Sequence, residues 1–236
     1  MTATDITTKA EQLHWYELPL YLFVGLALGF VGVLGINVLF PAMASSAAGA
    51  EPKAYWYVSR AAAFVAYGLL WVSMALGLLQ SRRASKAWPG PEAAIDLHEF
   101  TTLTALAFSA MHVLVLLGDS YIKYNLGSLL LPFGNDYRPA WVLLGQVGAY
   151  LVVPVVGSFY LRRHLGPKTW RTLHYLTFAV FTLVTAHGLG AGTDANNPAV
   201  LTMYGLAIVS LYAMTVYRIL ATIKTNKTAK VQPARA

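Results

Sequence analysis

Residues 97–117 read LHEFTTLTALAFSAMHVLVLL, and residues 170–189 read WRTLHYLTFAVFTLVTAHGL. Both segments are apolar, and about 20 residues are enough to cross the hydrocarbon core of a membrane as a helix. Each segment carries two histidines, 14 positions apart in the first and 13 in the second: His98, His112, His174 and His187. At a rise of about 1.5 Å per residue, each pair extends over roughly 20 Å of helix. Because imidazoles are costly in hydrocarbon unless something binds them, the four rings indicate a functional site.

The composition is that of a membrane protein. The chain is 57% hydrophobic and 11% charged, whereas an average globular protein is roughly 25% charged. Six runs without charge are long enough to cross a bilayer: 18–50, 61–81, 100–118, 139–161, 172–193 and 195–217. We therefore predict an all-α, six-transmembrane helix bundle, with helices near 17–42, 56–80, 97–117, 139–162, 170–189 and 199–221. A shorter apolar segment, 126–133, is expected to lie along the outer surface.

The positive charges indicate topology rather than a nucleic-acid partner. The net charge is +7, but Lys and Arg gather in 82–86, 162–171 and 218–235, which fall on one side of a six-helix serpentine. Because basic loops stay in the cytoplasm, both termini are expected inside. The predicted organisation is a cytoplasmic N-terminal segment (1–16), a six-helix domain (17–221) and a basic cytoplasmic tail (222–236). A bacterial inner membrane is the expected location, with helix one retained because 1–16 lacks a removable signal.

The helix count also predicts how the histidines pair. One span separates 97–117 from 170–189, so these two helices run parallel, and histidines at equal depth face each other. His98 is expected near His174 at the inner face, and His112 near His187 at the outer face. In a regular helix, 14 residues return to within about 40° of the same face, whereas 13 residues miss it by about 140°. The second helix therefore needs a tilt, a bulge or ligation from different sides.

Buried imidazoles can serve several kinds of site. A single buried histidine is usually a hydrogen-bonded core residue, but four in two depth-matched pairs favour a cofactor. Zinc is less attractive because two rings leave its usual tetrahedral shell incomplete, and a proton relay normally brings buried carboxylates. A six-coordinate haem iron needs only two axial imidazoles. With no cysteine in the chain, iron–sulfur clusters, thioether-linked haem and disulfides are excluded.

The segment 168–176 reads KTWRTLHYL and resembles the Trp-Arg-x-Leu-His signature of the ferric reductase-like transmembrane domain superfamily. That group includes ferric reductases, NADPH oxidase transmembrane domains and the haem-binding subunit of the bacterial methionine sulfoxide reductase system. The His98–His112 spacing, LPF at 131–133, DYRP at 136–139 and HG at 187–188 leading to GTD at 192–194 are also similar to that family. The similarity covers residues 55–195.

The resemblance implies two b-type haems with bis-histidine ligation, one held by His98 and His174 and the other by His112 and His187. It also implies roles for two arginines. Arg60 would pair with an outer haem propionate or polarise an acceptor, although an ordinary interfacial arginine is an equally good reading. Arg171 would meet inner propionates, although the positive-inside rule already explains it.

The expected function is a di-haem membrane cytochrome in the lipid bilayer. Larger relatives continue into flavin and NADPH domains, whereas this sequence ends at Ala236. We therefore expect a separate electron donor, a flavoprotein or quinol, and an outer acceptor: ferric iron, dioxygen or a redox partner protein. Turnover as an enzyme stays open. The alternatives are a quinol-linked b cytochrome of another family, and a non-redox transporter or scaffold with structural histidines.

Overall fold

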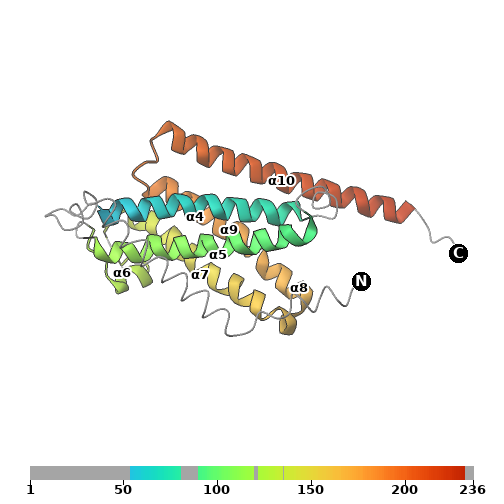
Figure 1. Cartoon of the computed structure of the whole chain (residues 1–236), viewed down its shortest axis with the longest axis horizontal. Coiled ribbons are helices and arrows are strands. Elements are labelled where there is room, and N and C mark those ends of the chain that lie inside the picture. Colours follow the sequence, from blue (N-terminus) through green and yellow to red (C-terminus); the bar gives the residue numbers. More distant parts are fainter. Residues whose placement is uncertain (1–53, 81–89, 120–121, 135, 232–236) are drawn as a thin grey trace. The chain divides into compact units, whose positions relative to one another are not determined.

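The computed structural model describes residues 54–80, 90–119, 122–134 and 136–231, and these contain helices and no strand. Figure 1 shows α4 (Ala54–Leu79), α5 (Pro91–Val115), α6 (Leu126–Leu130), α7 (Pro139–Tyr160), α8 (Arg162–His174), α9 (Leu176–Ala191) and α10 (Pro198–Val231), and a short 3-10 turn, η1 (Leu116–Gly118), extends α5. Five helical segments are long and apolar enough to cross a membrane: α4, α5 with η1, α7, α8 with α9, and α10. The chain is thus an all-α, multi-pass membrane protein. The predicted helix 17–42 and segment 1–16 lie outside the described residues.

Two helices extend beyond the boundaries that hydropathy predicted. α5 begins at Pro91 rather than residue 97, because Gly90 takes a φ of 102° and Pro91 stands at the first helical position, where its missing N–H is no loss. α10 continues to Val231, past the expected end at 221. Residues 222–231 contain no glycine or proline, so nothing local stops the helix. Hydropathy marks the apolar part of a helix, not its polar extensions.

Small residues let α7 and α9 approach closely. A Cβ atom on Gly148 would lie 3.2 Å from Cγ1 of Val184, which is tighter than an ordinary contact. Glycines at such positions bring helix backbones together in membranes, where packing rather than hydrophobic exclusion drives association. Gly166 has a different role: its φ of 74° breaks α8 one turn after Arg162, and Pro167 restarts the helix. The break lies between the predicted helices 139–162 and 170–189.

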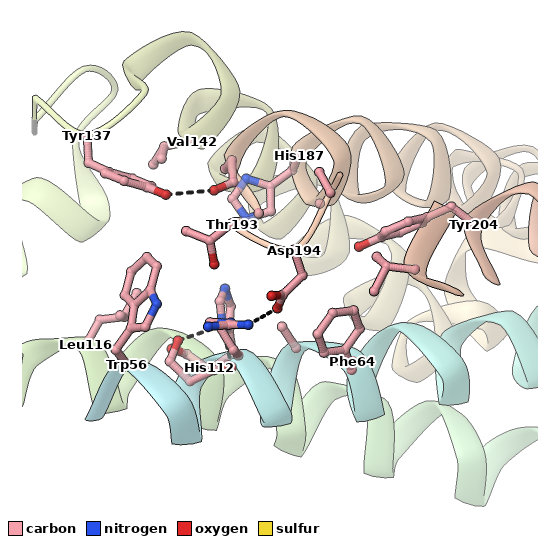
Figure 2. Close-up of a pocket in the computed structure, with 18 of the residues that line it drawn as sticks. Trp56, Phe64, His112, Leu116, Tyr137, Val142, His187, Thr193, Asp194 and Tyr204 are labelled. Carbon is pink, nitrogen blue, oxygen red and sulfur yellow. Dashed lines mark hydrogen bonds and ion pairs between the residues drawn. The ribbon is translucent and has the colours of Figure 1, made fainter. Parts of the chain in front are cut away.

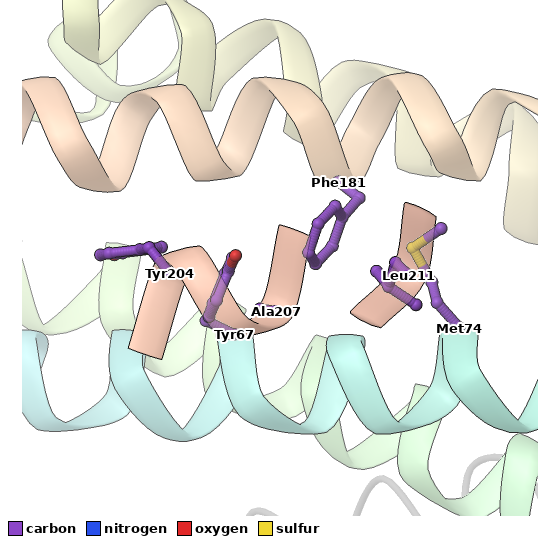
Figure 3. Close-up of a cluster of buried hydrophobic side chains, with 6 residues drawn as sticks. All are labelled: Tyr67, Met74, Phe181, Tyr204, Ala207 and Leu211. Carbon is purple, nitrogen blue, oxygen red and sulfur yellow. The ribbon is translucent and has the colours of Figure 1, made fainter. Parts of the chain in front are cut away.

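A cluster of buried side chains joins α4, α9 and α10: Tyr67, Met74, Phe181, Tyr204, Ala207 and Leu211 (Figure 3). The Tyr67 ring stacks on Phe181 at 5.4 Å between centroids and meets Tyr204 edge-on at 4.7 Å. The mid-span Trp71 packs against this cluster and donates its Nε1–H to Ser210 Oγ at 2.9 Å. Trp71 thus packs in the core of the helix bundle.

Candidate functional site

The four histidines form two pairs between α5 and the α8–α9 segment. The ring centroids of His98 and His174 are 6.1 Å apart with an interplanar angle of 74°. Those of His112 and His187 are 6.3 Å apart at 69°. The first histidine of each segment, His98 or His174, thus pairs with the first of the other, as in parallel helices. Figure 2 shows His112 and His187 approaching each other from opposite sides of a cavity.

These separations match two imidazoles bound on opposite sides of one metal ion. Metal–imidazole nitrogen bonds are about 2.0–2.1 Å long, and a ring nitrogen lies about 1.1 Å from the centre of a five-membered ring with bonds of this length. Two trans ligands therefore have centroids about 6.2–6.4 Å apart. Rings in edge-to-face contact without an ion have centroids about 4.5–7 Å apart, so the observed separations leave room for an ion between the rings. Both pairs are spaced as if a single ion stood between the rings.

The 13-residue spacing in the second segment is accommodated by an interruption. α8 ends at His174, α9 begins at Leu176, and Tyr175 stands between them. The backbone N–H of Phe178 donates to the Tyr175 carbonyl, three residues back, at 3.1 Å. A three-residue hydrogen bond tightens the turn relative to an α-helix. Tyr175 keeps helical φ and ψ angles of −63° and −17°, so the tightened turn removes only part of the rotation of about 140° expected for a regular helix.

The His98 ring is anchored through Nδ1. This nitrogen lies 2.8 Å from the carbonyl oxygen of Ser73 and 3.1 Å from its Oγ. Thr102 lies 2.6 Å from the Ser73 hydroxyl and donates its own proton to the His98 carbonyl. Because a carbonyl only accepts, the proton of a neutral His98 is on Nδ1, and the Nε2 lone pair is left available.

His112 and His187 are anchored in the same way. Nδ1 of His112 lies 2.9 Å from the Ser59 carbonyl and 2.8 Å from Ser59 Oγ, and this hydroxyl also donates to the His112 carbonyl. Nδ1 of His187 lies 2.9 Å from the carbonyl of Trp141. Metal-binding histidines usually donate their second ring N–H to a carbonyl, which fixes the tautomer and the ring orientation. Three of the four rings have this arrangement.

Sequence reasoning missed Ser59 and Ser73. They are 14 positions apart on α4, the same interval that separates His98 and His112 on α5. In two antiparallel helices, equal spacing matches each serine to one histidine. The equal intervals could have pointed to these serines. Serines are common in apolar segments, however, so the match is not informative until the folded structure shows the contacts.

Glycines leave room beside two of the rings. A Cβ on Gly145 would lie 2.8 Å from Nδ1 of His187, closer than real Cβ atoms approach. A Cβ on Gly77 would lie 3.4 Å from Cε1 of His98. A larger residue at 145 would therefore displace the His187 ring or the α7 backbone.

His174 is held differently from the other three rings. It stacks on Trp170 with centroids 5.5 Å apart and an angle of 27°. Nε1 of Trp170 is buried and has no hydrogen-bond partner among the described residues. An orphaned buried donor of this kind is rare in native proteins and indicates a missing acceptor. The Trp170 indole N–H is thus an unpaired hydrogen-bond donor next to His174.

A cavity surrounds the outer pair, with an empty volume of about 710 Å³ that includes space open to solvent. Arg60 and Asp194 line it and form an ion pair, each with 30% of its side chain exposed (Figure 2). The sequence singled out Arg60 but not its partner. Arg171 is exposed on α8 and does not line this cavity.

Two tyrosines close the loop side of the same cavity. Tyr137 donates its hydroxyl proton to the Ala191 carbonyl at 2.9 Å. Burial, with a smaller contribution from Tyr137, raises the pKa of Tyr124 to about 12. Tyr124 therefore stays neutral at physiological pH and brings a protonated phenol, not a charge, to the cavity wall.

The donor set fits a group with two trans imidazole ligands. Among the described residues there is no cluster of three or more His, Asp or Glu side chains suited to a metal ion. This disfavours a tetrahedral zinc centre in that part of the chain. A haem, whose porphyrin supplies the remaining four nitrogens, needs only the paired imidazoles. The anchored Nδ1 atoms, the ring separations and the unpaired Trp170 donor all suit such a group.

Two curated proteins are similar to this chain. The magnetosome protein MamZ of Paramagnetospirillum magneticum is 26% identical over 206 residues, which cover 86% of this chain and 29% of MamZ. MamZ of Magnetospirillum gryphiswaldense is 23% identical over 205 residues, with the same coverage. The chain thus spans less than a third of the length of these relatives. No family model and no solved structure matches it. The five apolar helices and the bacterial relatives indicate a multi-pass bacterial membrane protein.

Proposed function

We propose that this protein is a di-haem, b-type membrane cytochrome that carries electrons across the bilayer. The observation that carries the proposal is the pair of histidine couples, 6.1 and 6.3 Å between centroids, at two depths of one bundle. The resemblance of 168–176 to the ferric reductase-like superfamily supports the same assignment. His98 and His174 would hold one haem, and His112 and His187 the other.

The chain's own residues would bind and orient the cofactors. A haem iron with two imidazole ligands exchanges single electrons and keeps no open position for a substrate. Ser73, Ser59 and Trp141 hold Nδ1 of His98, His112 and His187, so the Nε2 of these three rings would be left to bind an iron. The Trp170 indole N–H would donate to an acidic group at the inner haem. Arg60 would lie beside the outer haem with Asp194 as its partner.

We further propose an inward-to-outward path in a bacterial inner membrane, with six spans and both termini in the cytoplasm. Moving an electron out of a negative interior is favourable by about 2.3 kcal/mol per 100 mV of membrane potential. A separate flavoprotein or quinol would supply electrons near His98 and His174. Ferric iron, dioxygen or a redox partner protein would accept them near His112 and His187.

The test is haem quantification on the purified full-length protein. Dithionite-reduced minus oxidised spectra and pyridine haemochrome assays should give two low-spin b haems per chain. The His112→Ala variant should keep about one, whereas His164→Ala, an exposed histidine outside both pairs, should keep two. Colourless protein from cells with adequate haem would refute the proposal and favour a non-redox membrane protein. Haem reduction that quinone-site inhibitors block would favour a quinol-linked cytochrome.

A further inference from the structure

The loop between α5 and α7 contains the five-residue helix α6 (Leu126–Leu130), and residues 126–133 include exposed large apolar side chains. Four of them are 62–64% exposed: Leu126, Leu130, Leu131 and Phe133. Large apolar side chains gathered at this exposure mark a surface that contacts something other than water.

The carbonyls at the end of α6 are satisfied by two side chains of α7. Nε2 of Gln146 donates to the carbonyls of Ser128, Leu129 and Leu131 at 2.9–3.1 Å. The Tyr150 hydroxyl donates to the Leu130 carbonyl at 2.5 Å. Four consecutive carbonyls, 128–131, therefore have protein donors. Where water is absent, carbonyls such as these depend on donors from the protein.

Side chains also cap the N-terminal end of α6. Asn125 accepts from the Ser128 N–H at 2.9 Å, and the Ser128 hydroxyl accepts from the Asn125 N–H at 2.8 Å. This reciprocal capping box satisfies two of the donors that a helix start leaves open. Within hydrocarbon, each backbone polar group must be satisfied by protein, because no water is present to replace a missing partner.

The position of these donors along α7 gives a depth. α7 has 22 residues, or about 33 Å, close to the thickness of a bilayer core. Trp141, 45% exposed near its start, is the type of residue that marks the membrane interface. Gln146 and Tyr150 lie 7 and 11 residues after Pro139, about 10 and 16 Å along the helix. The segment fastened to them thus lies beside the first half of a membrane span.

We propose that residues 126–133 form a re-entrant segment, inserted into the lipid leaflet beside the first half of α7, with its apolar side chains in contact with acyl chains. The sequence prediction placed this segment along the outer surface. The donors on α7 instead place it at the depth of the span itself. Tyr124, just before α6, lines the cavity around His112 and His187, so the insertion also fixes one wall of that cavity. The proposal holds whether or not haem is bound.

The absence of cysteine allows a direct measurement of depth. Single variants Leu126→Cys, Leu130→Cys and Phe133→Cys would carry a nitroxide spin label in nanodiscs of phosphatidylcholine and phosphatidylglycerol. Power-saturation EPR would compare relaxation by oxygen, which concentrates in lipid, with relaxation by a water-soluble nickel chelate. Val153→Cys, at a 70% exposed position on the membrane-spanning α7, is the lipid reference, and Asp136→Cys, in an exposed loop, is the water reference.

Labels at 126, 130 and 133 should relax with oxygen, as the Val153→Cys label does, and be protected from the nickel chelate. The variant Gln146→Met, which removes three of the four hydrogen bonds, should move the Leu130→Cys label toward the chelate. Labels as accessible to nickel as Asp136→Cys would overturn the proposal. Each label is compared with its own saturation under nitrogen, so that relaxation by a bound haem is subtracted from both accessibilities.

Discussion

The hydroxyl and the carbonyl oxygen of Ser59 both lie within 2.9 Å of Nδ1 of His112. The same two groups of Ser73, 14 residues further along α4, hold Nδ1 of His98. A serine on one helix thus sets the tautomer of a histidine on the next, once at each depth. An imidazole whose Nδ1–H is hydrogen-bonded is a stronger electron donor to a bound metal.

Removing either hydroxyl should raise the midpoint potential of one haem without removing it. In Ser59→Ala and Ser73→Ala the carbonyl still accepts from Nδ1–H, so ligation persists while the ring loses one of its two hydrogen-bond acceptors. A hydrogen bond contributes about 0.5–1.5 kcal/mol, which bounds the shift at roughly 20–60 mV for one electron. Redox titration measures it. Ser158→Ala, an equally buried serine on α7, is the control and should shift neither potential.

An alanine at position 145 should empty the outer site. Its Cβ would meet the His187 ring at 2.8 Å, so the ring or the α7 backbone must shift. Gly145→Ala should therefore bind about one haem instead of two. Gly157→Ala is the matched control on the same helix, because a Cβ there meets nothing within 4 Å. Equal haem content in the two variants would show that Gly145 leaves no essential space beside His187.

Arg60 and Asp194 should shift the outer potential in opposite directions. A positive charge stabilises the reduced haem and a negative charge destabilises it, with an effect that depends on distance and local dielectric. Arg60→Ala should therefore lower the outer midpoint potential and Asp194→Asn should raise it. Because the two charges are paired, the double variant should differ from the sum of the single changes. Shifts of the same sign, measured by redox titration, would contradict this electrostatic role.

Trp170 should secure the inner haem through its contact with His174. Trp170→Leu removes the stacked ring, so the occupancy of the inner site should fall in haem quantification. Trp170→Phe keeps an aromatic face and should retain most of the haem while losing the unpaired indole N–H. An inner occupancy that is equally high in Trp170→Leu would mean that stacking does not position His174.

Five of the six predicted spans, and which histidines pair, could be read from the sequence because both follow from length and order. A run such as 139–161 without charge has few alternatives to a membrane helix, and parallel helices determine which histidines share a depth. The interruption at Tyr175 could not be foreseen, because no glycine or proline marks it. The Arg60–Asp194 pair joins residues 134 positions apart, and only the folded chain brings them together.

Helix ends were the least predictable element for a physical reason. Hydropathy reports transfer into lipid, and α5 and α10 both continue as helices into polar sequence. Likewise, the apolar segment 126–133 is too short to span a membrane, so composition alone suggests an interfacial position. Its depth depends on Gln146 and Tyr150, whose hydrogen bonds to the loop appear only in the folded structure.

Low-temperature EPR of the oxidised protein and of the four single His→Ala variants tests the pairing most directly. Nearly perpendicular imidazole planes, 74° and 69°, keep the iron d orbitals close in energy and should give two strongly anisotropic low-spin signals. One signal should disappear in both His98→Ala and His174→Ala, and the other in both His112→Ala and His187→Ala. Loss of the same signal in His98→Ala and His112→Ala, or no low-spin signal in the wild type, would contradict two bis-histidine sites paired by depth.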